Sequence, residues 1–298
     1  MMSSSTGVSR RGLVRLGASA ALLAPLAGLA PRVVAAAGEA ESAKVGDDPW
    51  LGLKVGVASY SLSKLALDDA IKGIRRVGVN YVSIKDSHLS LKSTAEQRQA
   101  VVRKFRDAGI TPLSCGVVGL NDDEASLRNA FEYARDAGIP TIVCKPTRQS
   151  LAQLDKLVKE FNIRLAIHNH GPEDKVWPSP LDAWEAVQPF DERIGVCIDV
   201  GHTARCGVDP AVAIRKCAPR LYDLHFKDLS SREGKSKPVV VGWGVLDTLA
   251  MLRALLEIKY PYHVGLEYEA DMNDPLPGVA ESIGYVRGAL AGLKHAGA

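Results

Sequence analysis

The sequence lacks the cysteine pattern of a disulfide-stapled protein. Its five cysteines are odd in number and show no C-x-x-C spacing. Three of them lie inside apolar, strand-like runs, where a thiol usually serves as a small hydrophobic side chain. We therefore expect free thiols at all five positions, namely Cys115, Cys144, Cys197, Cys206 and Cys217.

Two further absences narrow the class of protein. No G-x-G-x-x-G phosphate loop follows the first predicted strand, which runs into Ala58-Ser59-Tyr60-Ser61, and this argues against a dinucleotide-binding sheet. Of the 37 lysines and arginines, four lie in residues 1–38, which contain no acid; 33 basic side chains then face 34 acidic ones. Without a basic stripe or arm, no nucleic-acid partner is expected. No Ser/His/Asp or Cys/His nucleophile arrangement stands out either.

The N-terminus has the order of features found in a targeting segment. A twin-arginine pattern at Ser9–Val14 precedes an apolar stretch, Leu16–Ala30, and an A-x-A site at Ala35–Ala37. This order predicts a twin-arginine signal peptide over residues 1–37, cleaved on export to the periplasm or the medium, and a linker over 38–50. The alternatives are a docked helix and a retained anchor. The stretch is short for an anchor and is interrupted by Pro25 and Pro31, so we expect no membrane span after processing.

From residue 51 onward, short apolar runs alternate with amphipathic segments. Eight strands are predicted at 53–59, 80–85, 111–118, 141–145, 164–169, 195–199, 221–227 and 263–269. Eight helices are predicted at 67–77, 95–108, 124–137, 150–161, 180–187, 210–217, 246–258 and 278–293. This alternation predicts an α/β fold with a parallel sheet. An open doubly wound sheet is the competitor, but the missing phosphate loop favours a single (β/α)8 TIM barrel over residues 51–298.

Charged and imidazole groups gather at the predicted strand ends, which meet at one rim of such a barrel. The period of two along a strand places one inward-facing donor on each of four neighbouring strands. These donors are His168, Asp199, His225 and Glu267. Mixed nitrogen and oxygen ligands suit Mn²⁺, Zn²⁺, Co²⁺ or Fe²⁺ better than Mg²⁺ or Ca²⁺. Taken singly, a strand histidine can also be a satisfied core residue, and Glu269 can be a solvated carboxylate.

The chain resembles the xylose isomerase-like TIM barrels, the sugar isomerase/epimerase superfamily that also holds inosose dehydratases and endonuclease IV. The resemblance covers the chain from about Leu53 to its end. The segments that carry it are Ala166–Gly171, Cys197–His202, Leu224–Asp228, Gly242–Asp247 and Gly265–Glu269. The combination of a D-x-G-H turn, an H-x-K-D strand end and a last strand with glutamate is specific, whereas each part alone is weak.

The resemblance implies metal binding by Asp199, His225 and Glu267, with His202 contacting metal or substrate. The family usually has glutamate where this chain has His168, which removes one of the two carboxylates that epimerases of the family use as a pair. His168 can still ligate metal, and Glu267 is the base or a ligand only. The remaining predicted contacts are Lys145 and Lys227 to a sugar oxygen or an enolate, and His170, Lys85 and Trp177 to the substrate. Trp177 has an equally good alternative as a loop residue packed on the barrel wall.

These observations predict a divalent-metal-dependent isomerase or epimerase, with Mn²⁺ as the first choice of metal. Such an enzyme removes a proton next to a carbonyl and stabilises the resulting enediolate. Export favours a non-phosphorylated sugar or sugar-like polyol as the small-molecule substrate. The alternatives are a lyase or hydratase acting on 3-keto-glycosides at the same site and an exported carbohydrate-binding protein without catalysis; an abasic-site nuclease shares only the fold. The sequence predicts no oligomeric state.

Overall fold

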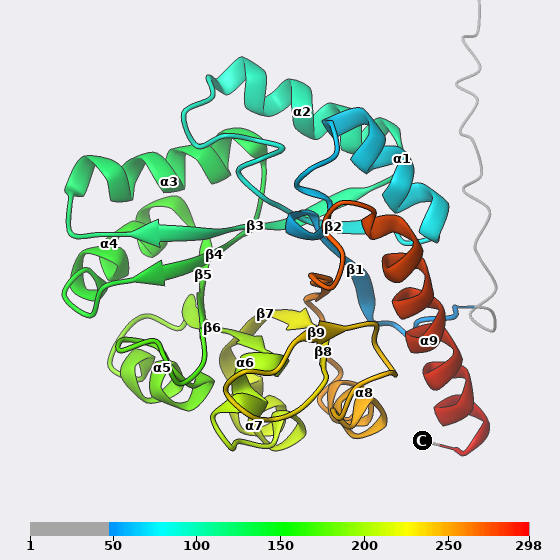
Figure 1. Cartoon of the computed structure of the whole chain (residues 1–298). Helices are drawn as coiled ribbons and strands as arrows, with labels where there is room; N and C mark the ends of the chain where they lie inside the picture. The colour runs from blue at the N-terminus through cyan, green and yellow to red at the C-terminus, as the bar shows by residue number, and fades with distance from the viewer. Residues whose placement is uncertain (1–47, 298) are drawn as a thin grey trace, which may run out of the picture. The chain divides into compact units, whose positions relative to one another are not determined.

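Eight parallel strands close into a barrel, as the sequence predicted. The computed structural model describes residues 48–297, and Figure 1 labels its strands and helices. Neighbouring strands follow the order β1-β10-β7-β6-β5-β4-β3-β2. The barrel strands are β1 (Lys54–Ala58), β2 (Tyr81–Ile84), β3 (Thr111–Leu120), β4 (Thr141–Pro146), β5 (Arg164–His168), β6 (Ile194–Asp199), β7 (Leu221–Phe226) and β10 (His263–Leu266).

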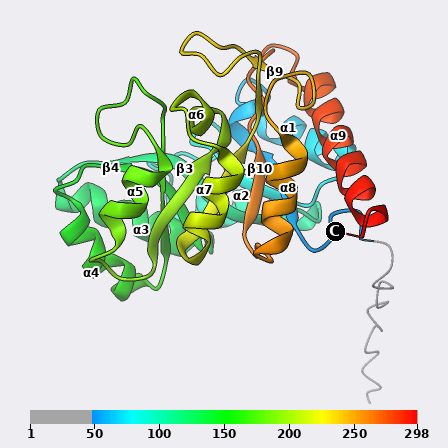
Figure 2. The ribbon, with the colours of Figure 1, turned by 90° about the horizontal axis from the view of Figure 1, so that it is seen from below.

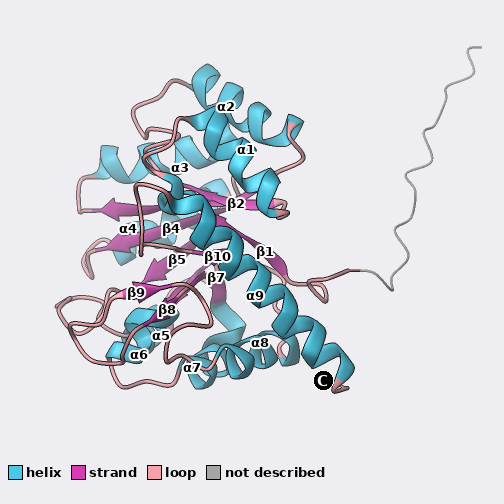
Figure 3. Ribbon diagram, turned by 45° about the vertical axis from the view of Figure 1, so that its right-hand side comes forward, coloured by secondary structure: helices cyan, strands magenta, loops and turns pink. Residues whose placement is uncertain are grey.

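The helices surround the strands on the outside (Figure 3). They are α1 (Leu67–Val77), α2 (Ala95–Asp107), α3 (Glu124–Ala137), α4 (Leu151–Phe161), α5 (Pro180–Val187), α6 (Val200–Arg205), α7 (Pro210–Cys217), α8 (Thr248–Glu257) and α9 (Pro275–His295), with short 3-10 turns at Ser59–Leu62 and Ala218–Arg220. Eight of the nine α-helices match predicted segments. α9 starts earlier than predicted, with a proline in its first turn, where no backbone N–H is needed.

Helix α1 shows why these segments fold as they do. Its buried side is formed by Ala70, Ile71 and Ile74, at the spacing that keeps apolar residues on one face of a helix. The helix ends at Gly78, whose φ of 81° lies in the left-handed region that glycine adopts without strain. Sequence periodicity therefore located both the helix and its end.

The interior of the barrel holds a polar pair below the strand ends. His263 Nδ1 lies 3.4 Å from the carboxylate of Asp223, and both side chains are buried. Two glycines make room for the imidazole, because a Cβ on Gly56 or Gly265 would come within 2.6 Å or 2.5 Å of the ring. Strands β7 and β10, which carry this pair, also lead to the predicted donors His225 and Glu267 at the strand ends. A polar layer of the barrel therefore lies directly below the predicted site.

The sequence did not reveal helix α6 or a small hairpin formed by β8 (Asp228–Leu229) and β9 (Pro238–Val239). Residues 232–237 lie in the turn of this hairpin. The buried carboxylate of Asp228 organises the segment that follows, because it accepts four backbone N–H bonds of 2.8–3.1 Å. The four donors are Leu229, Gly242, Gly244 and Leu246.

Other predictions concern the ends of the chain and the cysteines. The predicted signal peptide, residues 1–37, and the linker up to residue 47 lie outside the described residues. Within residues 48–297, no helix combines the length and apolar character needed to cross a membrane. All five cysteines are free thiols, which confirms the prediction.

Replacing the Asp228 carboxylate should destabilise the fold more than an ordinary helix cap does. We expect Asp228→Ala to lower the free energy of unfolding by about 2–4 kcal/mol, because two buried and two partly buried N–H groups lose a charged acceptor. The matched control is Asp247→Ala, which removes the exposed cap of α8 and should cost about 1 kcal/mol. Urea unfolding of both variants measures the difference. Equal losses would show that Asp228 does not anchor the segment.

Candidate functional site

Four neighbouring strands bring the predicted donors together. His168 ends β5, Asp199 ends β6, His225 lies near the end of β7, and Glu267 directly follows β10. The pairing register places Asp199 beside His225 and Gly265 beside His225 on its other side. One ligand atom from each of the four residues lies within 4.8 Å of the others. The spatial cluster inferred from strand periodicity is therefore present.

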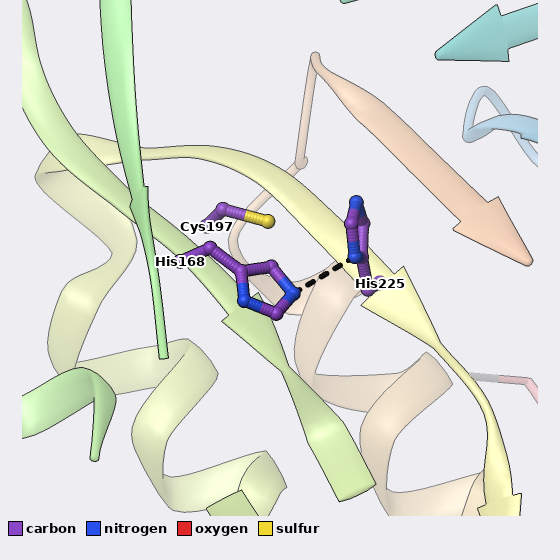
Figure 4. Close-up of side chains that lie close together, drawn as sticks. All are labelled: His168, Cys197 and His225. Carbon is purple, nitrogen blue, oxygen red and sulfur yellow. Dashed lines mark hydrogen bonds between the residues drawn. The ribbon is translucent and has the colours of Figure 1, made fainter. Parts of the chain in front are cut away.

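The distances inside this cluster are short. His168 Nε2 lies 2.9 Å from His225 Nδ1, as the dashed line in Figure 4 shows. It also lies 3.5 Å from Asp199 Oδ2, and His225 Nδ1 lies 3.3 Å from Glu267 Oε2. Atoms bound to one metal ion at about 2.0–2.2 Å are themselves about 3–3.5 Å apart. The donor set therefore fits a single divalent ion.

Two ring nitrogens of the cluster have no hydrogen-bond partner among the described residues, namely His168 Nδ1 and His225 Nε2, which take no part in the short contacts above. Buried polar atoms normally have one. Asp199 Oδ2 lies 3.0 Å from the Lys227 ammonium and 3.5 Å from His168 Nε2. Cys197 lies beside the two histidines in Figure 4 and could join them as a third donor. Burial raises the pKa of this thiol well above its usual value, so Cys197 is a neutral thiol in the protein without metal.

Lys227 lies inside the same cluster, two residues after His225. Its ammonium is 3.0 Å from Asp199 Oδ2, 2.7 Å from Glu267 Oε2 and 2.9 Å from Glu269 Oε2. Its side chain is only 4% exposed, so these carboxylates replace the water that it loses. Glu269, which the sequence left open as a surface residue, is thus part of the site.

The protonation states follow from these contacts. Burial alone would lower the pKa of Lys227, but Asp199, Glu267 and Glu269 raise it well above its usual value. Burial would raise the pKa values of Asp199 and Glu267, yet Lys227 and a nearby histidine hold both below their usual range. These three groups are therefore charged at neutral pH.

The two histidines of the cluster differ in their pKa values. Burial lowers the pKa of His168 to about 3, so His168 is neutral at neutral pH and keeps a lone pair for a ligand. Burial would also lower the pKa of His225, but the carboxylate of Glu267 outweighs it and raises this pKa. The site therefore holds three carboxylates and one ammonium beside a neutral His168.

Asn169 and α6 hold Asp199 in place, and neither was assigned a role from the sequence. Asn169 accepts a hydrogen bond from Asp199 N at 2.9 Å and donates to Thr203 Oγ1 at 3.2 Å. Asp199 Oδ1 caps α6 by accepting from His202 N at 2.8 Å, which leaves Oδ2 facing the cluster. The sequence did contain a signal for this helix, because aspartate is a common N-cap residue and Asp199 ends an apolar strand.

A cavity of about 230 Å³ opens above the cluster. It is lined by several of the predicted residues and by others that sequence reasoning missed. The predicted ones are Lys85, His168, His170, His202, His225, Lys227 and Glu267; the missed ones include Tyr60, Gly116, Val117 and Glu269. Lys85 Nζ lies 5.4 Å from the centre of the Tyr60 ring. The cavity therefore combines a carboxylate side with lysine, tyrosine and histidine side chains.

Three predicted site residues do not line this cavity: Asp199, which is fully buried within the cluster, and Lys145 and Trp177. Lys145 forms an ion pair with Asp174, whose carboxylate also accepts backbone bonds from Val176 and Trp177. Trp177 is fully buried, and its Nε1 donates to Pro146 O at 2.7 Å. The predicted contacts of Lys145 and Trp177 with a substrate are corrected accordingly: both side chains fix the loop between β5 and α5, and Trp177 takes the packed position.

Solved structures with the same fold include sugar epimerases and a dehydratase. The L-ribulose 3-epimerase structure is 16% identical, with a TM-score of 0.67 over 82% of this chain and 97% of that one. The 3-keto-D-glucoside 4-epimerase YcjR of E. coli is 15% identical, with a TM-score of 0.66 over 79% and 99%. The protein described as the probable 3-DHS dehydratase AsbF of Bacillus anthracis is 11% identical, with a TM-score of 0.63 over 80% and 99%. At these identities the likeness establishes the fold.

Sequence comparison gives the family. The rhizopine catabolism protein MocC of Rhizobium meliloti is 27% identical over 152 residues, which is 46% of this chain and 46% of that protein. The match thus spans less than half the length of that relative. The family model for the xylose isomerase-like TIM barrel matches residues 71–289. The chain therefore belongs to the xylose isomerase-like TIM barrel family.

Proposed function

We propose that this protein is a divalent-metal-dependent enzyme that isomerises or epimerises a non-phosphorylated sugar or sugar-like polyol. The observation that carries the proposal is the cluster of His168, Asp199, His225 and Glu267 at the floor of the cavity, with 2.9–3.5 Å between neighbouring donor atoms. Mixed nitrogen and oxygen donors suit Mn²⁺, which we propose first, or Zn²⁺, Co²⁺ or Fe²⁺. Sugar epimerases among the structural neighbours support the substrate class.

The charges of the site support a divalent ion in particular. Asp199, Glu267 and Glu269 contribute three negative charges and Lys227 one positive charge, while His168 is neutral. Buried charges need compensation, because transfer from water costs several kcal/mol per ion. A divalent cation brings this set to neutrality once His225, which must be deprotonated to act as a ligand, carries no charge. When bound, the ion would act as a Lewis acid that polarises a substrate carbonyl.

The residues around the cluster would handle the substrate and its proton. Glu267 is a weak base because Lys227 and His225 hold its pKa low, so we assign it to metal binding. Glu269 lines the cavity and has a side chain 29% exposed, which places it where a substrate proton can be taken. Lys227 lies between the two carboxylates and can donate to the developing enediolate oxygen. Lys85, His170 and His202 would bind other substrate oxygens.

Elimination is the second candidate reaction. His168 occupies the place where the family resemblance leads us to expect glutamate, so a symmetrical pair of carboxylate bases is missing. A single base on one face is enough to remove a proton and expel a β-leaving group, as a lyase acting on 3-keto-glycosides would do. The 3-DHS dehydratase among the structural neighbours shares the fold.

Export to the periplasm or the medium stays a proposal that rests on the twin-arginine pattern of Ser9–Val14. Phosphorylated sugars are largely cytoplasmic, so this location favours free or oxidised sugars as substrates.

Metal content and proton exchange test the proposed function together. We expect the purified protein to bind about one equivalent of Mn²⁺ and to move deuterium from D₂O into a keto-sugar or a 3-keto-glycoside, with loss of exchange after chelation. Elemental analysis and NMR measure the two quantities. A protein that contains no bound metal and whose activity a chelator does not change would contradict the proposal. Sugar binding without exchange or elimination would instead identify a carbohydrate-binding protein.

Substitutions of Glu267 and Glu269 should distinguish a residue that binds the metal from a residue that transfers the proton. Glu267→Gln removes a ligand, so we expect Mn²⁺ affinity to fall by more than about 100-fold, the upper range for residues that only support a ligand. Glu269→Gln should keep the metal and slow deuterium exchange by about 10²–10⁴-fold, the usual contribution of a general base. Calorimetric titration and exchange rates read the two effects. A Glu269→Gln variant that exchanges at the parent rate would remove Glu269 as the base.

A further inference from the structure

Arg205, the last residue of α6, contacts three segments at the rim of the cavity. Its Nη1 lies 3.2 Å from Nδ1 of His202, one turn earlier in the same helix. Its Nη2 donates to Gly234 O at 2.9 Å and to the carboxylate of Glu173. Glu173 belongs to the loop after β5, and Gly234 to the turn between β8 and β9. Figure 2 shows α6 close to the base of these two loops.

The contact with His202 fixes how that imidazole carries its proton. A guanidinium has five donors, no acceptor and a permanent charge, so Nδ1 of His202 must be the acceptor. A neutral imidazole that accepts at one nitrogen carries its hydrogen on the other. His202 is therefore held as the tautomer with the hydrogen on Nε2.

The Nε2–H group of His202 is the part of the ring left for a ligand. His202 lines the cavity above the cluster, and within residues 48–297 no hydrogen-bond partner of Nε2 is present. The His170 ring lies beside it, with ring centroids 6.1 Å apart and an angle of 24° between the ring planes. An N–H donor held in this way recognises an oxygen acceptor.

Gly171 is a second observation that supports the contact between Arg205 and His202, because its lack of a side chain leaves room for both groups. Its φ is 90°, and a Cβ there would come within 3.0 Å of Arg205 Nη1 and 3.2 Å of His202 Nδ1. A side chain at this position would push the guanidinium away from the imidazole. The ion pair with Glu173 alone would not explain the arrangement, because Glu173 is 61% exposed and exposed pairs contribute little to stability.

We propose that Arg205 is a positioning residue that holds His202 in the Nε2–H tautomer, as a hydrogen-bond donor to a carbonyl or hydroxyl oxygen of the substrate. The same side chain joins the two rim loops next to that donor. The identity of the ligand as a sugar oxygen rests on the proposed function, whereas the tautomer is a property of the protein without substrate.

Nitrogen NMR of the full mature chain labelled with ¹⁵N-histidine tests the tautomer directly. We expect His202, assigned through His202→Gln, to show a protonated Nε2 and an unprotonated Nδ1 in the parent protein. Arg205→Met should give a mixture of both tautomers. If a substrate is found, kcat/KM should also fall by about tenfold, the value of one lost hydrogen bond.

Two control variants separate this role from loop packing. Glu173→Gln removes the ion pair but keeps Arg205 beside His202, and Arg148→Met removes the arginine that stacks on Trp177 and donates to Val176 O in the same loop. Both should leave the His202 signals unchanged. Arg205→Gln is measured as well in case Arg205→Met does not fold; its amide can both donate and accept, so it should also give both tautomers.

Three results would overturn the proposal: a hydrogen on Nδ1 in the parent protein, parent-like His202 signals in both Arg205 variants, or equal changes in the controls. Each of them is independent of whether the enzyme proposal holds, since no metal or substrate enters the measurement.

Discussion

The site depends on the compensation of charge in a space that excludes water. Lys227 is buried among the carboxylates of Asp199, Glu267 and Glu269, and no member of this set is stable there alone. The attraction keeps the carboxylates ionised and close together, which is the state that a metal ion requires. The remaining negative charge is what a divalent cation would neutralise. The neutral state of His168, caused by burial, adds a donor without adding charge.

The surrounding chain holds these groups in place with hydrogen bonds from the backbone. Asp199 uses one oxygen to cap α6 and directs the other to the cluster. Asp228, the residue after Lys227, binds four backbone N–H groups and thereby fixes the segment that follows the strand end. Catalytic geometry in TIM barrels generally comes from such loops after parallel strands. In this protein, Asp228 serves the backbone, whereas Asp199 both caps α6 and faces Lys227.

Sequence periodicity predicted the barrel and its four-residue cluster, because both depend on patterns that repeat every two or 3.6 residues. It could not predict partners that the tertiary fold selects. The ion pair of Lys145 with Asp174 and the burial of Trp177 both depend on the path of one loop. The contacts of Arg205 with Glu173 and Gly234 also depend on the paths of loops, because these two residues lie about 30 positions away on either side in the sequence. Helix α6 was missed because six residues are too few to show a helical period.

We propose that the four donors at the strand ends share one divalent ion. Anomalous X-ray scattering from crystals grown with Mn²⁺ tests it most directly, because the signal locates the ion irrespective of any substrate. The account predicts one strong peak within about 2.0–2.3 Å of His168, Asp199, His225 and Glu267, with the Lys227 ammonium outside the coordination sphere. A crystal in which Lys227 still fills the space between Asp199 and Glu267 and no peak lies at the cluster would contradict it.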